Sequence, residues 1–198
     1  DTNQADVGQV TRFADGIVSI TGMTHCRYGE LVYIGDAAAI AMNISENDVD
    51  AVLLSSDMTS EQNAIAQASG DVVRVPVGEA LLGRVVDPLG RPLDGMKAPK
   101  CVKKRPIEAP SPSIHDRQKV AKPLMTGILS IDSMIPIGRG QRELIIGDRQ
   151  TGKTTIAIDT ILNQRDKNVL CVYVAIGQKA STIADVVNTL REHGALDY

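Results

Sequence analysis

The chain has 198 residues, of which 43% are hydrophobic and 23% charged, and its formal net charge at pH 7 is −3. This length allows one or two domains, and the composition is typical of a globular protein rather than a disordered chain. The small negative charge gives no field that would steer the chain onto a nucleic acid, and one Phe, four Tyr and no Trp cannot build a base-stacking platform. We therefore expect a globular protein that binds no nucleic acid.

The cysteines and the termini give weaker indications. Cys26, Cys101 and Cys171 are an odd number at wide spacings, which fits neither a disulfide framework nor a zinc knuckle and favours a reducing compartment. No apolar run reaches the roughly 18 residues of a membrane span. The chain begins at Asp1 without an initiator Met or a secretory signal, so we interpret it as processed or as a piece of a longer sequence.

Short β-type runs separated by turn residues occupy the first part of the chain. We predict strands at Val10–Phe13, Ile17–Thr21, Glu30–Ile34, Val49–Leu54 and Val72–Val77. Thr59–Ser69 has no clear period and is predicted to be a loop. Strands recurring about every ten residues predict a small closed barrel or sandwich over residues 1–77.

The pattern changes after a proline-rich connector between Pro88 and Pro123. Beyond it, apolar spacing predicts helices at 124–134, at 153–164 and from a cap at Ser181 or Thr182 to a stop at Gly194. Apolar runs of strand length lie at 143–146 and 169–175. A strand, a helix and a strand in this order predict a βαβ unit, and hence a second, α/β domain over residues 78–198.

One motif carries chemistry. The sequence from Gly147 to Thr154 reads G-D-R-Q-T-G-K-T, which satisfies G-x-x-x-x-G-K-T, and it lies after a predicted strand and opens a predicted helix. The glycines let the backbone amides turn toward phosphate oxygens, and the helix amino terminus adds positive potential. The predicted nucleotide site comprises Gly147, Asp148, Arg149, Gln150, Thr151, Gly152, Lys153, Thr154 and Thr155.

The side chains of this motif have distinct expected roles. Lys153 would bridge the β- and γ-phosphates, the Thr154 hydroxyl is placed to ligate Mg²⁺, and Thr155 can reach the α-phosphate. The expected ligand is a magnesium–nucleotide complex. The competing interpretation is an accidental glycine turn followed by a lysine.

Two further groups of polar residues are weaker candidates. His25, His115 and His193 have no partner at metal-ligand spacing. The basic cluster Lys100, Lys103, Lys104 and Arg105 could bind an anion, but a short charge run is more often a solvated face.

The residues Gly138–Glu143, followed by Leu144–Ile146 and the motif, closely resemble the alpha subunits of F-type ATP synthases. The resemblance continues through Val75–Asp87 and Val174–Lys179, and it spans most of Val7–Tyr198. It implies a six-stranded β-barrel, the crown, over 1–77 and a RecA-like P-loop domain, incomplete at its C-terminus, over 78–198. The chain departs from the family at 59–68, which lacks the usual basic segment, and before residue 7, where the usual helix is missing.

Gln178 distinguishes relatives within this family. Catalytic beta subunits have a glutamate after a glycine at the matching place, whereas Gly177 is followed here by Gln178, and an amide is no base. The resemblance therefore implies a site that binds ATP or ADP with Mg²⁺ but does not turn ATP over. Arg149 and Gln150 resemble additional phosphate contacts of the alpha type.

The resemblance also implies the surroundings of the chain. Expected partners are beta subunits in an alternating ring, gamma and delta-type stalk subunits, and a C-terminal continuation of the same subunit. The complex would be a proton-transporting two-sector ATPase, peripheral to the cytoplasmic face of a bacterial plasma membrane or, alternatively, to the mitochondrial inner membrane or thylakoid. The arginine finger and the Walker B Asp are not expected within this chain.

Two other functions remain open at this stage. A catalytic beta-like or secretion-type ATPase subunit would require a glutamate at position 178. A nucleic-acid translocase similar to the terminator Rho would need a basic, aromatic barrel, whereas residues 1–77 hold few basic residues.

Overall fold

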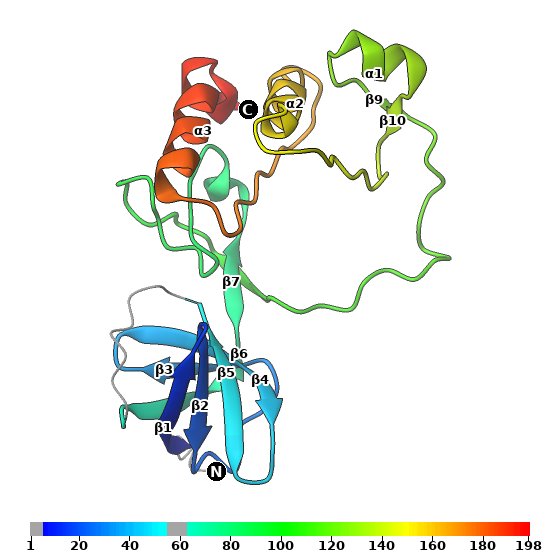
Figure 1. Cartoon of the computed structure of the whole chain (residues 1–198). Helices are drawn as coiled ribbons and strands as arrows, with labels where there is room; N and C mark the ends of the chain where they lie inside the picture. Colours follow the sequence, from blue (N-terminus) through cyan, green and yellow to red (C-terminus); the bar gives the residue numbers. More distant parts are fainter. Residues whose placement is uncertain (1–5, 55–62) are drawn as a thin grey trace. The chain divides into compact units, whose positions relative to one another are not determined.

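A computed structural model describes residues 6–54 and 63–198 (Figure 1). The chain forms two compact units. One runs to Leu81 and includes Val85–Pro110, and the other combines Leu82–Arg84 with Ser111–Tyr198. The expected domain boundary after residue 77 stays a prediction, because compactness alone does not define a domain.

The first unit contains a closed antiparallel barrel with the strand order β1-β2-β5-β4-β3-β6. The small closed barrel expected from the strand spacing is confirmed, with the six strands that the resemblance implied. Its strands are β1 (Val7–Ala14), β2 (Ile17–Thr21), β3 (Glu30–Ile34), β4 (Ala37–Ile44), β5 (Asp48–Leu53) and β6 (Ile65–Val72).

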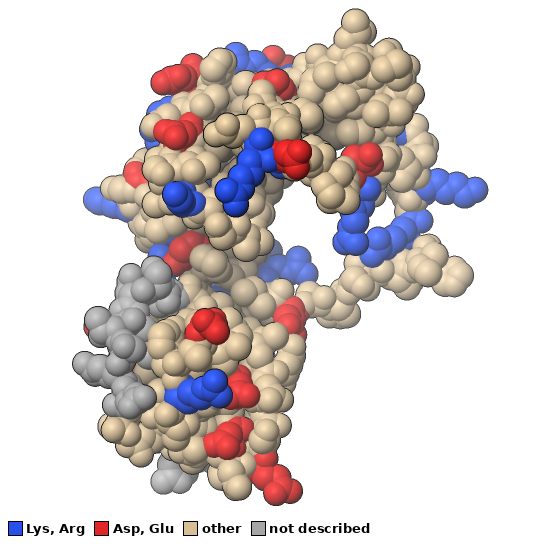
Figure 2. Space-filling model, in the orientation of Figure 1, with Lys and Arg blue, Asp and Glu red and all other residues tan. Residues whose placement is uncertain are grey.

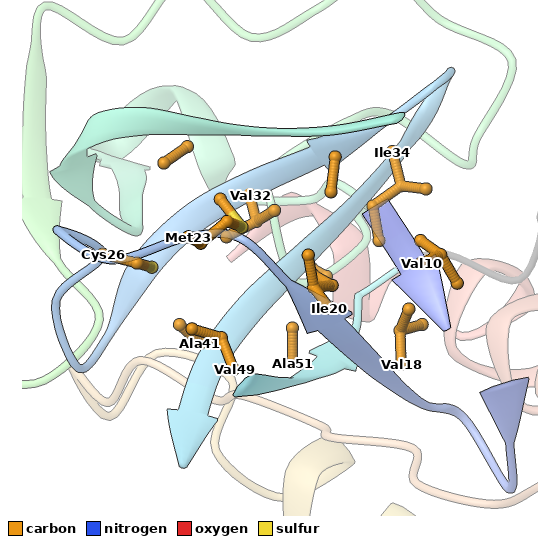
Figure 3. Close-up of a cluster of buried hydrophobic side chains, with 13 residues drawn as sticks. Val10, Val18, Ile20, Met23, Cys26, Val32, Ile34, Ala41, Val49 and Ala51 are labelled. Atoms are coloured by element: carbon orange, nitrogen blue, oxygen red, sulfur yellow. The ribbon is translucent and has the colours of Figure 1, made fainter. Parts of the chain in front are cut away.

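Alternating apolar side chains fill the barrel interior (Figure 3). Val10, Val18, Ile20, Val32 and Val49 are fully buried, and small alanines from β4, β5 and β6 complete the packing. The pairing shifts register once between β1 and β2, once between β3 and β6 and once between β4 and β5, and such bulges bend strands enough to close a small barrel. The core is thus aliphatic, as a chain almost without aromatics requires.

Three expectations about these strands were wrong. The strand β4 was missed, because Ala37–Ala41 is buried at every position and therefore shows no alternation. The loop expected at Thr59–Ser69 is a strand from Ile65 onward, since Ala66 and Ala68 face the core and alanine gives a weak strand signal; residues 59–62 lie outside the described residues. The strand expected at 72–77 is divided between β6 and β7 (Arg74–Val77).

Close backbone approaches and a buried carboxylate hold the barrel ends. A Cβ on Gly8 would lie 2.5 Å from the Thr21 carbonyl oxygen, so only glycine fits there. The Glu30 carboxylate is 4% exposed and accepts hydrogen bonds from the amides of Gly70, at 2.7 Å, and Arg27, at 2.9 Å. The Cys26 thiol is also buried in the barrel. Its burial raises its pKa to about 11, and the negative charges of Glu30 and Asp6 add to this shift.

Beyond the barrel, β7 pairs with β8 (Lys103–Pro106) as an antiparallel ribbon, and the short helix η1 (Glu79–Leu81) lies between the two strands in the chain. Three residues of the basic cluster, Lys103, Lys104 and Arg105, lie in β8 and are exposed. Part of the proline-rich connector is therefore a strand.

The second unit contains three α-helices, one short 3-10 helix and one small ribbon. They are β9 (Pro123–Leu124), α1 (Leu129–Met134), β10 (Ile137–Gly138), α2 (Lys153–Leu162), α3 (Ala180–Glu192) and the short helix η2 (Ala195–Asp197). The expected second and third helices are confirmed, and Gly194 ends the last one with φ 68°. The helix expected over 124–134 starts late because Leu124 pairs with Ile137.

The expected cap of α3 was wrong. The capping position is Lys179, and no side chain caps the helix. Because helix boundaries read from periodicity shift by a residue or two, the Ser181 and Thr182 hydroxyls fall inside the first turn.

The strands expected at 143–146 and 169–175 are absent from the described structure. Both segments lack secondary structure and ladder partners, and they expose apolar side chains: Leu144 is 80% and Val172 is 83% exposed. A strand requires a neighbour to pair with its amides and carbonyls, and none lies beside either segment. The predicted βαβ unit is therefore represented here only by its helix.

Hydrogen bonds join the segment before α1 to the end of α2. Asn163 and Gln164, just beyond α2, both donate to the Met125 carbonyl at 2.8 Å. The following turn is closed by Asp132, whose carboxylate accepts from the Thr126 amide and hydroxyl and from the Gly127 amide. These bonds lower the pKa of Asp132, the Thr126 hydroxyl most strongly.

The helices α2 and α3 share a small apolar cluster. Val186, Leu190 and Ala195 are buried there against Ile158 and Ile161. No helix in the described ranges 6–54 and 63–198 has the length and apolarity needed to cross a membrane.

Candidate functional site

The expected site lies where α2 begins. Gly152 is the residue before the helix, in the left-handed conformation with φ 85°, and its carbonyl accepts from the Ile156 amide at 3.1 Å. The amides of the first turn have no acceptor within the helix, and no side chain caps them. They form a positive end that can receive an anion.

The loop before the helix follows a path that depends on two glycines. A Cβ on Gly147 would lie 2.8 Å from Thr151 Oγ1, whereas the space beside Gly152 is open to 4 Å. Gln150 also has a left-handed backbone, with φ 62°, which a non-glycine residue adopts at some cost in free energy. The loop therefore reverses direction and leaves open space beside Gly152, where the helix begins.

Lys153 folds back across this loop. Its ammonium donates to the carbonyls of Gly147, at 2.8 Å, and Asp148, and it lies 3.4 Å from Thr151 Oγ1. The Thr151 hydroxyl donates to the Asp148 carbonyl at 2.9 Å. The structure thus joins four of the predicted site residues in one hydrogen-bonded loop.

The remaining predicted residues are less constrained. Arg149, Thr154 and Thr155 are exposed, the two threonines in the first turn of α2. The side chain of Gln178 is joined to the Tyr173 hydroxyl, with Nε2 3.3 Å from it, and its hydrogen bonds in the described chain do not reach the loop. The sequence offered no signal for Tyr173, because this contact depends on how the segment 173–178 bends.

These residues fit a magnesium–nucleotide complex. The space beside Gly152 is open, and the first-turn amides point their positive ends toward it, as phosphate binding requires. The Lys153 ammonium lies against the loop. The Thr154 hydroxyl is a hard oxygen ligand of the kind Mg²⁺ takes. A G-x-x-x-x-G-K-T loop that opens a helix is the defining feature of P-loop proteins.

Comparison with known proteins narrows the class. Residues 127–198 match the nucleotide-binding domain of the ATP synthase alpha/beta family. Over 194 residues the chain is 54% identical to ATP synthase subunit alpha of Acetivibrio thermocellus, an alignment that covers 98% of this chain and 38% of that protein. The chain belongs to the ATP synthase alpha/beta family, and its sequence corresponds to an alpha subunit. It spans somewhat over a third of the length of this curated relative.

Proposed function

We propose that this chain forms the barrel and the noncatalytic nucleotide site of an F-type ATP synthase alpha subunit, binding ATP or ADP with Mg²⁺ in a complex that couples proton flow to ATP synthesis. The observation that carries the proposal is the P-loop closed by Lys153, in a chain 54% identical to an alpha subunit.

The loop residues divide the binding of the nucleotide among them. The amides at the start of α2 would receive phosphate oxygens, and Lys153, with its charge already held over the loop, would neutralise the β- and γ-phosphates. Thr154 would supply an oxygen to Mg²⁺, and Arg149 would add a second cation from the exposed part of the loop. Bound Mg²⁺ would add further positive charge at the phosphates.

Gln178 supports a noncatalytic site. Hydrolysis needs a group that orients and polarises the attacking water. A neutral amide neither carries charge nor acts as a base at neutral pH. The hydrogen bond that Gln178 Nε2 donates to the Tyr173 hydroxyl uses part of the hydrogen-bonding capacity of this amide. The proposed role of Gln178 is to contact the water shell of the metal.

The proposed assembly follows from the same likeness. The subunit would alternate with beta subunits in a ring, contact gamma and delta-type stalk subunits, and lie at the cytoplasmic face of a bacterial plasma membrane. Residues 1–77 contain three Lys or Arg and eleven Asp or Glu, and Figure 2 shows acidic side chains spread over the barrel. An acidic barrel supports protein partners over a nucleic acid.

The substitution Lys153→Ala in the full-length chain that carries this sequence tests the site. Loss of a charge-assisted contact predicts Mg-ATP binding weaker by roughly tenfold to a hundredfold. Isothermal titration calorimetry measures it, with Lys119→Ala in the exposed connector as the matched control. Equal affinity of wild type and Lys153→Ala would remove Lys153 from the site, and with it the proposal.

The noncatalytic role has its own experiment. Gln178→Glu should bind Mg-ATP without rapid hydrolysis, because this site would still lack the other groups that stabilise the transition state in a catalytic beta subunit. Phosphate release by the purified full-length chain is the measurement. Fast turnover by wild type, or by Gln178→Glu alone, would contradict this part of the proposal.

A further inference from the structure

The Thr151 hydroxyl has more contacts within the loop than its place in the motif requires. The motif leaves this position open to any residue, yet Oγ1 donates to the Asp148 carbonyl at 2.9 Å and lies 3.4 Å from Lys153 Nζ. The same oxygen lies against Gly147, where an added Cβ would come within 2.8 Å. One side chain therefore contacts the start, the middle and the end of the loop.

Counting donors and acceptors shows what the hydroxyl does for the lysine. An ammonium has three N–H donors and no acceptor, and three oxygens of the loop face it: the carbonyls of Gly147 and Asp148 and the Thr151 hydroxyl. A hydroxyl can donate one hydrogen bond while it accepts another. Thr151 thus braces the loop through Asp148 and offers an acceptor to the third N–H of Lys153.

We propose that Thr151 is a positioning residue of the phosphate site, whose hydroxyl braces the loop between residues 148 and 151 and holds the third N–H of Lys153 until a phosphate oxygen replaces it. This inference rests on the proposed nucleotide site and adds a specific role within it. When Lys153 turns toward the β- and γ-phosphates, its contact with the Thr151 hydroxyl is released, whereas the bond from Thr151 to the Asp148 carbonyl stays in place.

The two contacts of the hydroxyl have opposite effects on affinity. The brace fixes the loop before the ligand arrives, so losing it weakens binding. The contact with Lys153 competes with phosphate, so losing it strengthens binding. The brace, at 2.9 Å, is a good hydrogen bond, whereas the lysine contact, at 3.4 Å, is at the outer limit of one. The brace dominates, and removing the hydroxyl should weaken binding overall.

The experiment compares Thr151→Val, which removes the hydroxyl and keeps the shape, with Thr151→Ser, which keeps the hydroxyl, in the full-length chain. Calorimetry with Mg-ATP, Mg-ADP and inorganic tripolyphosphate measures affinity. We expect Thr151→Val to weaken all three by roughly threefold to tenfold, the size of one hydrogen bond, and Thr151→Ser to restore most of it. An equal loss for tripolyphosphate is specific to a brace acting on the phosphate cradle.

A matched control separates the brace from general stability. Thr189 donates from its hydroxyl to the Asp185 carbonyl at 2.9 Å within α3, so Thr189→Val removes a similar bond outside the loop and should leave affinity unchanged. Thr151 is exposed, so the melting temperature of the empty Thr151→Val variant should stay within about 2 °C of wild type.

Each outcome decides between the two proposals. If wild type binds none of the three ligands, the proposed nucleotide site fails and this inference fails with it. If wild type binds and Thr151→Val binds equally or more tightly, the site stands and the brace is wrong. If Thr151→Ser is as weak as Thr151→Val, the hydroxyl is not the cause and the inference is also overturned.

Discussion

The barrel strands and the apolar segments beside the P-loop differ in whether their backbone hydrogen bonds find a partner. In the barrel each strand pairs on both sides, and Val10, Val18 and Ile20 reach complete burial. In the second unit, the apolar segments 143–146 and 169–175 have strand-like sequences but no pairing partners. An apolar run of strand length is therefore insufficient for a strand, because the backbone also needs a neighbour to satisfy its hydrogen bonds.

This difference sets where the chain is sensitive to substitution. Burial in the barrel is complete, so removing atoms there leaves a cavity. The exposed apolar side chains of the second unit make few packing contacts, so removing them costs little. Substitutions of similar size in the two regions should consequently have very different effects.

The largest expected effect compares two truncations. Ile20→Ala removes a fully buried side chain of the barrel core and should lower the free energy of unfolding of the barrel by about 2 to 5 kcal/mol. Leu170→Ala removes a side chain of the second unit that is 72% exposed, and it should change the free energy of unfolding of that unit by less than about 0.5 kcal/mol. Urea unfolding followed by far-UV circular dichroism measures both, and equal effects would contradict the comparison.

A second comparison uses two glycines that a methyl group would crowd. Alanine at Gly8 meets the backbone carbonyl of Thr21, which cannot move without breaking the barrel, so Gly8→Ala should destabilise by about 1 to 3 kcal/mol. Alanine at Gly138 meets only the half-exposed Val120 side chain, which can turn away. Thermal unfolding should show a clear fall for Gly8→Ala and little change for Gly138→Ala.

The sequence predicted much of the fold because its signals were local. Strand spacing indicated the barrel, and the glycine-lysine motif located α2 to the residue at which it begins. The strand β4 could not be recognised, since an alanine-rich run buried at every position has no period and alanine favours helices. Its strand state depends on pairing with β3, from Leu31 with Ile40 to Ile34 with Ala37, which is tertiary information.

The site was predictable as a list of residues and not as a set of contacts. The motif identifies Gly147 and Lys153 because every phosphate loop of this type needs them. Nothing in the motif distinguishes Thr151 from other residues that can occupy its place, and its contacts with Asp148 and Lys153 follow from the fold of the loop. The contact of Gln178 with Tyr173 likewise depends on a bend that no periodicity records.

The reactivity of two cysteines, Cys26 in the barrel and Cys171 in the second unit, compares the two regions chemically. The pKa of Cys26 is raised to about 11 and that of Cys171 is raised by burial alone. Thiolate is the reactive form, so at pH 8 Cys26 should react with iodoacetamide about a hundredfold more slowly in the folded chain than when unfolded, and Cys171 should be slowed less. Peptide mass spectrometry over time measures both. Faster alkylation of Cys26 than of Cys171 would contradict it.

The same thiol predicts a pH dependence of stability. The folded pKa of Cys26 lies above the unfolded value of 9.0, so the folded state holds more protons between pH 9 and pH 11. The free energy of unfolding should fall as the pH rises through this range. Cys26→Ser should reduce the slope, which a urea titration at each pH would reveal.

The smallest effect concerns the turn closed by Asp132. Hydrogen bonds from Thr126 and Gly127 lower the pKa of this carboxylate, so its contribution is present above pH 3.8 and is lost as the pH falls through the folded value. Amide exchange at Gly127 should therefore show less protection in Asp132→Asn than in wild type at neutral pH. Equal protection in the two proteins would show that the turn does not depend on the carboxylate.

The helix α2 joins two distant pieces of the second unit. The phosphate loop lies at its first residue, and Asn163 and Gln164, just beyond its last, hold the carbonyl of Met125. Ten helical residues make a stiff rod about 15 Å long, with a hydrogen-bonded attachment at each end. Any change in the direction of α2 would therefore shift both the phosphate loop and the turn before α1.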